Sequence, residues 1–132
     1  MQKLEKFIYN SGGRNHPSGT GEWEIETTKS CQITVKHISG SKAEFNTAFS
    51  LDQKECIQLW KLVKKMKIDT LYFRSRPPVP DETLHTFILE THDAIYEKQI
   101  LDNDVARIPG YHEFSAYIRK LVMDAIGKKP IF

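Results

Sequence analysis

Apolar and polar residues alternate along much of the first fifty positions. Between Glu22 and Thr28, Trp23, Ile25 and Thr27 fall on one side and three glutamates on the other, the period of a half-buried strand. The same alternation over 31–36 and 43–49, together with the apolar residues of 4–9, predicts three further strands. Since their short polar connections suit antiparallel neighbours, we expect a four-stranded meander with one apolar face.

The hydrophobic period changes after residue 50. Apolar side chains then recur at intervals of three and four residues from Cys56 to Met66, and Ser50 and Gln53 have the spacing of a capping box. This pattern predicts a helix over about 51–66. A second apolar stripe, from Phe114 to Ala125 and followed by Gly127, predicts another helix near the end of the sequence.

The remaining segments predict three more strands. Residues 70–73 read as a short strand, and 84–90 and 94–101 read as a hairpin, with a polar connection over 102–109. The expected fold is therefore a single α+β domain spanning residues 1–132. Its mainly antiparallel sheet has about seven strands in the order ββββ-α-βββ-α, with both amphipathic helices packed on one face.

Composition fits a packed domain and excludes several classes of protein. The 132 residues are 39% hydrophobic and include seven Phe, five Tyr and two Trp, enough for a sizeable core. A net charge of +2 argues against nucleic-acid binding as a main function, although five lysines give the first helix a basic side. No apolar run reaches the ~20 residues of a membrane span, so we expect no membrane association.

Neither the start of the sequence nor the cysteines suggest export. The first ten residues, MQKLEKFIYN, lack the apolar region of a signal peptide, so we expect a cytoplasmic protein. The alternative is an exported protein whose leader is missing from this sequence. Cys31 and Cys56 fall on predicted apolar faces outside any CxxC motif, and we expect two reduced buried thiols rather than a disulfide.

The sequence contains none of the short motifs that mark a catalytic, metal or cofactor site. Its five histidines have neither HExxH nor HxH spacing, and GxSxG and the phosphate-binding glycine motifs are absent. We therefore expect no metal, no cofactor and no catalytic residues. The sequence favours a protein that is not an enzyme.

Two unusual loops supply the candidate binding residues. The glycine-rich loop 11–21 contains Arg14 and His16, and the proline-rich loop 74–82 contains Arg74 and Arg76. Arginine forks suit carboxylate or phosphate groups, so these four side chains make a candidate anion site if both loops lie at one end of the sheet.

Two functional hypotheses remain open. The first is a small non-catalytic binding or protein-interaction module that forms a homodimer or captures a protein partner through a sheet edge or face. The alternative is a small ligand-binding protein or enzyme that holds an anionic ligand between loops 11–21 and 74–82.

Overall fold

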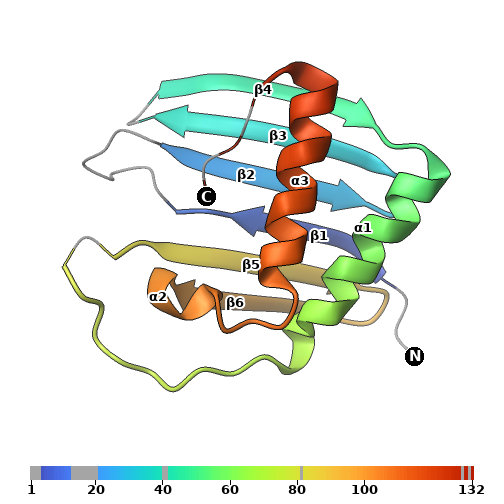
Figure 1. Cartoon of the computed structure of the whole chain (residues 1–132). Coiled ribbons are helices and arrows are strands. Elements are labelled where there is room, and N and C mark those ends of the chain that lie inside the picture. The colour runs from blue at the N-terminus through green and yellow to red at the C-terminus, as the bar shows by residue number, and fades with distance from the viewer. Residues whose placement is uncertain (1–3, 13–20, 40–41, 81, 129, 131) are drawn as a thin grey trace.

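The computed structural model describes residues 4–12, 21–39, 42–80, 82–128, 130 and 132. Within those ranges the chain forms one antiparallel sheet of six strands in the order β4-β3-β2-β1-β5-β6. The helices cover one face of this sheet, as Figure 1 shows. The predicted α+β class and the placement of the two long helices on one face are confirmed.

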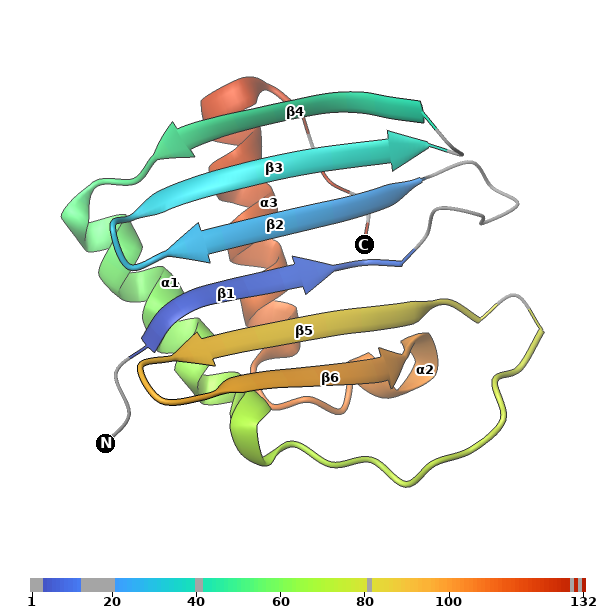
Figure 2. The ribbon, with the colours of Figure 1, turned by 180° about the vertical axis from the view of Figure 1, so that it is seen from behind.

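The first four strands form the predicted meander. A hairpin then pairs its first strand with β1, so β4 and β6 are the two outer strands, as Figure 2 shows from the open face. The strands are β1 Leu4–Asn10, β2 Glu22–Thr28, β3 Gln32–Ser39, β4 Lys42–Ser50, β5 Leu84–Thr91 and β6 Ile95–Leu101.

The open face of the sheet carries compensated charges. Lys6 lies 3.6 Å from Glu26 and 3.8 Å from Glu90, and Lys36 lies 3.8 Å from Glu24. Opposite charges on neighbouring strands stabilise a solvated sheet face. The polar half of the strand alternation therefore faces away from the helices.

Two long helices supply the other layer of the core. α1 (Gln53–Met66) packs beside α3 (Tyr111–Ile126), and both bury apolar residues against the sheet. At the centre, Phe7 of β1 meets Phe114 of α3 edge to face, with ring centroids 5.5 Å apart. Gly127 ends α3 as predicted, in the left-handed conformation at φ 71°.

The cap of α1 differs from the prediction. Asp52 accepts a hydrogen bond from the Glu55 backbone N–H, and the Glu55 carboxylate accepts one from the Asp52 N–H. The expected Ser50–Gln53 box is wrong because the β3–β4 pairing extends one residue further, with Leu51 N–H donating to the Cys31 carbonyl at 2.8 Å. The first residue free to cap the helix is therefore Asp52.

The predicted seventh strand at 70–73 is wrong. A short 3-10 helix, η1 (Ile68–Thr70), follows α1, and residues 71–80 then run outside the described sheet. Thr70 is the last residue of η1, and the Leu71 N–H bonds back to the Ile68 carbonyl at 3.3 Å instead of to a neighbouring strand. Further along, the prolines at 77, 78 and 80 lack the N–H that a ladder needs. The predicted polar connection after β6 contains a third, short helix, α2 (Asp102–Val105).

The prediction of two reduced thiols is also wrong. Cys31 and Cys56 form a disulfide with a Cα–Cα distance of 5.4 Å. Cys31 lies in the turn between β2 and β3 with φ 67°, and Cys56 lies in the first turns of α1. The β2–β3 turn and the start of α1 are close enough for a disulfide bond. The alternation of apolar and polar residues does not give this distance.

None of the described helices is long and apolar enough to cross a membrane.

Candidate functional site

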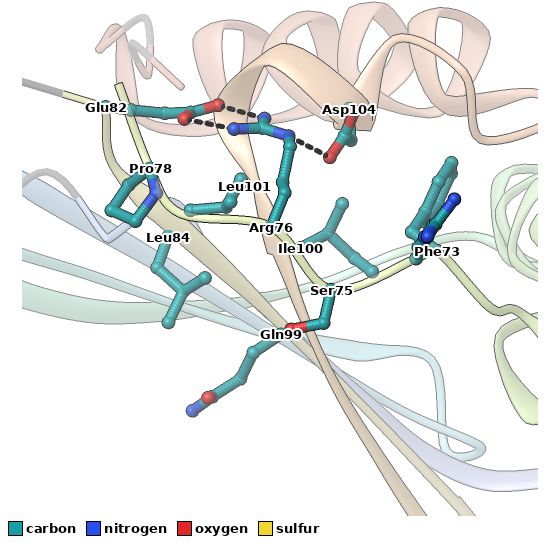
Figure 3. A pocket seen from close by; sticks show the side chains of 11 residues that line it. Phe73, Ser75, Arg76, Pro78, Glu82, Leu84, Gln99, Ile100, Leu101 and Asp104 are labelled. Atoms are coloured by element: carbon teal, nitrogen blue, oxygen red, sulfur yellow. Dashed lines mark hydrogen bonds and ion pairs between the residues drawn. The ribbon is translucent and has the colours of Figure 1, made fainter. Parts of the chain in front are cut away.

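A groove runs beside the outer strand β6. It encloses about 430 Å³ between the proline-rich segment and the β5–β6 hairpin (Figure 3). Its floor is apolar, with Phe73, Pro78, Leu84, Ile100 and Leu101, and its rim is polar. A few hundred cubic ångströms with an apolar floor and a polar rim is typical of a binding site.

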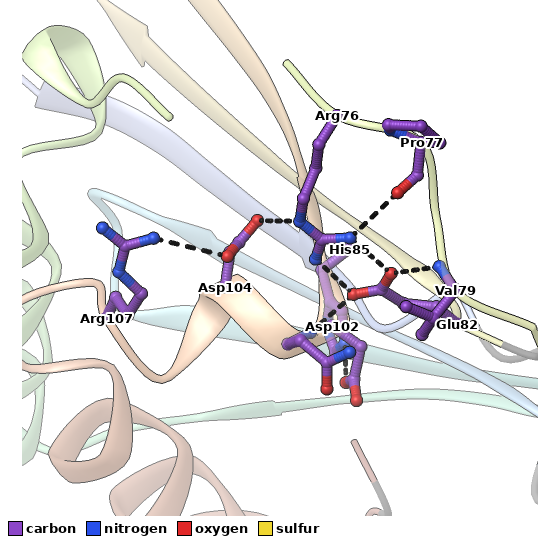
Figure 4. A network of polar contacts seen from close by, with 9 residues as sticks. Arg76, Pro77, Val79, Glu82, His85, Asp102, Asp104 and Arg107 are labelled. Atoms are coloured by element: carbon purple, nitrogen blue, oxygen red, sulfur yellow. Dashed lines mark hydrogen bonds and ion pairs between the residues drawn. The ribbon is translucent and has the colours of Figure 1, made fainter. Parts of the chain in front are cut away.

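Arg76 holds the outer wall of this groove in place. Its guanidinium donates to both oxygens of the Glu82 carboxylate at 2.8 and 2.6 Å and, through Nε, to Asp104 Oδ2 at 3.2 Å (Figure 4). Glu82 has only 1% of its side chain exposed. A bidentate pair of this kind fixes both side chains in direction as well as distance.

Backbone groups complete the network around Glu82. The carboxylate also accepts the Val79 N–H at 3.0 Å and the Asn103 N–H of α2 at 2.9 Å. The hydrogen bond from Arg76, followed by these two N–H groups, lowers the pKa of Glu82 to about 2. The carboxylate therefore stays ionised at neutral pH and ties the proline-rich segment to α2.

The four predicted anion-binding residues have different positions. Arg14 and His16 lie outside the described residues. Arg76 is occupied by two carboxylates, which neutralise its charge, so it is not available to an incoming anion. Arg74 is exposed on the groove, and no ion pair to it is present in the described part of the chain.

The described ends of the two loops lie at the same end of the sheet. Gly12, with φ 66°, packs so closely on the start of β5 that a Cβ there would be 1.8 Å from the Leu84 carbonyl oxygen. Leu84 lines the groove. The described ends of the two loops are therefore neighbours, and of the predicted residues that the structure describes only Arg74 has no carboxylate partner.

The open edge of β6 offers backbone groups to the groove. Thr91 and Ala94 lie opposite each other at one end of the β5–β6 ladder, and the Thr91 N–H donates to the Ala94 carbonyl at 2.8 Å. At the other end of the ladder, the Asp102 N–H donates to the Thr83 carbonyl. Because antiparallel residues bond to alternate sides, Glu97, Gln99 and Leu101 direct their N–H and C=O groups away from β5. Gln99 and Leu101 line the groove.

A buried chain of polar side chains lies behind the groove. The Tyr9 hydroxyl is 2.7 Å from His85 Nδ1 and 2.5 Å from the Tyr111 hydroxyl, and His85 Nε2 is 2.7 Å from Asp102 Oδ1. Tyr9, His85 and Tyr111 are at most 6% exposed, whereas the Asp102 side chain is half exposed. This relay joins β1, β5, α2 and α3.

One arrangement of protons satisfies the relay. Neutral His85 donates from Nε2 to Asp102 and accepts from the Tyr9 hydroxyl at Nδ1, which leaves the Tyr9 oxygen to accept from Tyr111. Burial lowers the pKa of His85, and burial raises the pKa of Tyr9 and of Tyr111. All three groups are therefore neutral at pH 7.

The relay has the chemical order of a hydroxyl, a histidine and a carboxylate, but its hydroxyl is closed to solvent. Tyr9 has 0% of its surface exposed and His85 1%. A nucleophile has to touch its substrate, and the Tyr9 oxygen is not accessible to one in the conformation described.

The protonation of His85 predicts an acid-sensitive stability. Since its folded pKa lies below its ordinary value of 6.5, the unfolded chain binds the proton first as pH falls. We expect the free energy of unfolding to fall as pH decreases below about 6.5. Urea unfolding at a series of pH values measures this, and His85→Gln should flatten the slope between pH 7 and 5, while an unchanged slope contradicts it.

The basic side of α1 is less uniform than its sequence indicates. Lys54, Lys61 and Lys120 line a second groove of about 440 Å³ between α1 and α3, but Asp52 and Glu55 line it too. Lys65 is paired with Glu113 at 2.6 Å. This mixture of charges offers no continuous track for a phosphate backbone.

No family model matches this chain. No curated protein matches it either. Within the described residues, no cluster of three metal-ligating side chains is present.

Sequence reasoning missed most of the polar centre. Tyr9 is 76 residues from His85 and 102 from Tyr111 along the chain, so no local motif joins them. The one usable signal was His85 itself, a polar residue on the apolar side of an alternating strand. Asp102 and Asp104 belong to the segment 102–109 that was expected to be a polar connection, although both take part in side-chain networks through α2.

Proposed function

We propose that this protein is a non-catalytic interaction domain that binds an extended peptide segment of a partner along β6. The observation that carries the proposal is an apolar-floored groove lying on the unpaired side of an outer strand. Strand addition of this kind takes its affinity from backbone hydrogen bonds and its specificity from pockets for alternate side chains.

The Arg76 network supports the same proposal. A groove wall made of a proline-rich segment needs a rigid attachment if it is to be preformed for a ligand, and Arg76, Glu82 and Asp104 provide one. Preformed walls lower the entropy cost of binding. Because Arg76 is neutralised inside the wall, the groove favours an uncharged or apolar segment over a strong anion.

A second candidate function rests on Arg74. Its guanidinium is exposed on the groove, so a small carboxylate or phosphate ligand is the alternative occupant. An anion bound by Arg74 alone would be solvated and salt-sensitive. We therefore prefer a peptide over a small anion as the ligand of the β6 groove.

The disulfide indicates in which cellular compartment the protein functions. Disulfides persist in oxidising environments and are rare in the cytosol of most organisms. The Cys31–Cys56 bond supports the exported alternative over the cytoplasmic expectation.

The test is an NMR titration of the isotope-labelled protein with peptides selected from a random displayed library of about ten residues, the length that spans a strand of this size. We expect amide shifts at Glu97, Gln99 and Leu101 and along residues 73–76. Gln99→Pro removes an N–H that points into the groove and leaves the β5 ladder intact, so it should weaken binding by at least about tenfold.

A proline on the opposite edge is the matched control. Ala48→Pro on β4 should leave the peptide affinity unchanged. Selected peptides that shift residues outside the groove would contradict the proposal. Shifts confined to Arg74 on titration with phosphate or succinate, with no peptide binding, would establish the second candidate instead.

A further inference from the structure

We propose that the β4 edge pairs with β4 of a second copy of this chain, joining two six-stranded sheets into one. The partner is the same strand in antiparallel orientation, related by a two-fold axis perpendicular to the sheet. This surface lies at the opposite edge from the β6 groove, so the proposal stands independently of the peptide-binding function.

The hydrogen-bond pattern shows which backbone groups β4 leaves unpaired. Leu51 and Cys31 lie directly opposite each other, and Leu51 N–H donates to the Cys31 carbonyl at 2.8 Å. By alternation, Thr47 and Phe49 bond to β3. Asn46, Ala48 and Ser50 therefore direct their N–H and C=O groups toward the open edge.

This part of β4 lacks the features that normally protect an outer strand. Between Asn46 and Ser50 there is no charged residue and no proline, and the register shift between β3 and β4 lies elsewhere, at His37/Ile38. Native sheets usually guard their edges with charges, prolines or bulges. An unguarded edge of five residues is a template for another strand.

The two edges of this one sheet differ in this respect. The charged residues of β4, Lys42 and Glu44, lie before this stretch, whereas β6 carries Glu97 and Lys98 at its centre and has the wall of the groove beside it. A two-fold pairing centred on either of these residues would place like charges opposite each other, which destabilises a sheet. The contrast selects β4, and not β6, as the self-associating edge.

A two-fold pairing centred on Ala48 is self-complementary. It places Asn46 opposite Ser50 and Thr47 opposite Phe49, pairs that combine two polar amide or hydroxyl groups and a β-branched residue with an aromatic one. Thr47 and Phe49 are half-buried in the single chain and lie on the helix side of the sheet. The axis keeps both helical layers on that side, so pairing covers these two residues further.

Light scattering coupled to size exclusion tests the pairing across concentrations from about 10 µM to about 1 mM. We expect the mass to rise from the 15.3 kDa of one chain toward twice that value. Ala48→Pro removes an edge-facing N–H without touching the β3 ladder and should hold the mass at one chain throughout. Gln99→Pro, the same change on β6, should dimerise like the wild type.

Hydrogen exchange gives a second readout that does not depend on a variant that folds. The amides of Asn46, Ala48 and Ser50 should exchange more slowly as the protein concentration rises, while those of Glu97 and Gln99 stay constant. A mass of one chain at every concentration overturns the proposal. A dimer that survives Ala48→Pro, or is lost equally in Gln99→Pro, also overturns it, because the contact then lies elsewhere.

Discussion

Reducing the Cys31–Cys56 disulfide is expected to lower the free energy of unfolding by about 3–4 kcal/mol. The bond closes a loop of sequence separation 25, and the reduced unfolded chain regains the conformational freedom that this closure removes. Urea unfolding with and without reductant, followed by circular dichroism, measures the difference. A loss of this size is a large fraction of the stability of a domain this small.

A double variant separates the bond from the reagent. Cys31→Ala/Cys56→Ala should resemble the reduced protein and should not respond to reductant. If reductant leaves the unfolding midpoint of the wild type unchanged, the two sulfurs are not bonded in the folded protein. Purified protein that reacts with two equivalents of a thiol reagent after denaturation would likewise show that the bond is absent.

Replacing Tyr9 with Phe is expected to destabilise the protein by about 2–4 kcal/mol although it removes a single oxygen atom. The lost hydroxyl is the centre of the relay, and its removal leaves His85 Nδ1 without a donor and the Tyr111 hydroxyl without an acceptor. Both groups are buried, so neither recovers a hydrogen bond to water. Thermal or urea unfolding measures the cost.

The double variant tests the coupling. Tyr9→Phe/Tyr111→Phe removes the stranded Tyr111 hydroxyl, so the two substitutions together should cost less than the sum of the single ones. Additive single and double effects would show that the two hydroxyls do not share a hydrogen bond. Phe87→Leu, a change in the apolar part of the same core, provides a comparison without polar atoms.

α2 connects the two polar networks. Asp102, in its first position, accepts from His85, and Asp104 accepts from Arg76 one half-turn later. The backbone N–H of Asn103, between them, donates to Glu82. One short helix therefore anchors both the buried relay and the wall of the β6 groove, which places the most polar part of the interior directly behind the proposed binding surface.

The sequence predicted secondary structure well where the signal was local. The alternation of 22–28 and the stripe from Phe114 to Ala125 each depend on a side-chain period that a few successive residues define. The same reasoning failed at 70–73 and at 102–105. Both segments are too short to define a side-chain period. η1 is closed by the local bond from the Leu71 N–H to the Ile68 carbonyl, and α2 depends on a distant residue, Glu82, which accepts the Asn103 N–H.

The candidate site was predictable only in part. Arg74 and Arg76 do line a groove beside the proline-rich segment, because that loop was recognisable from its composition. That Arg76 would be neutralised could not be predicted, since its partner Asp104 lies 28 residues away on a helix that the pattern did not indicate. The absence of charged residues and proline from residues 46–50 can be read from the sequence, but the position of β4 at the edge of the sheet cannot.

By itself the sequence determined the α+β class, the meander and the two long helices, because hydrophobic periodicity acts within each element. Only the tertiary structure decided the strand order, the disulfide, the Tyr111–Tyr9–His85–Asp102 relay and the neutralisation of Arg76. These features join residues between 6 and 102 positions apart, and whether such side chains meet depends on strand register and on how helices pack across the sheet.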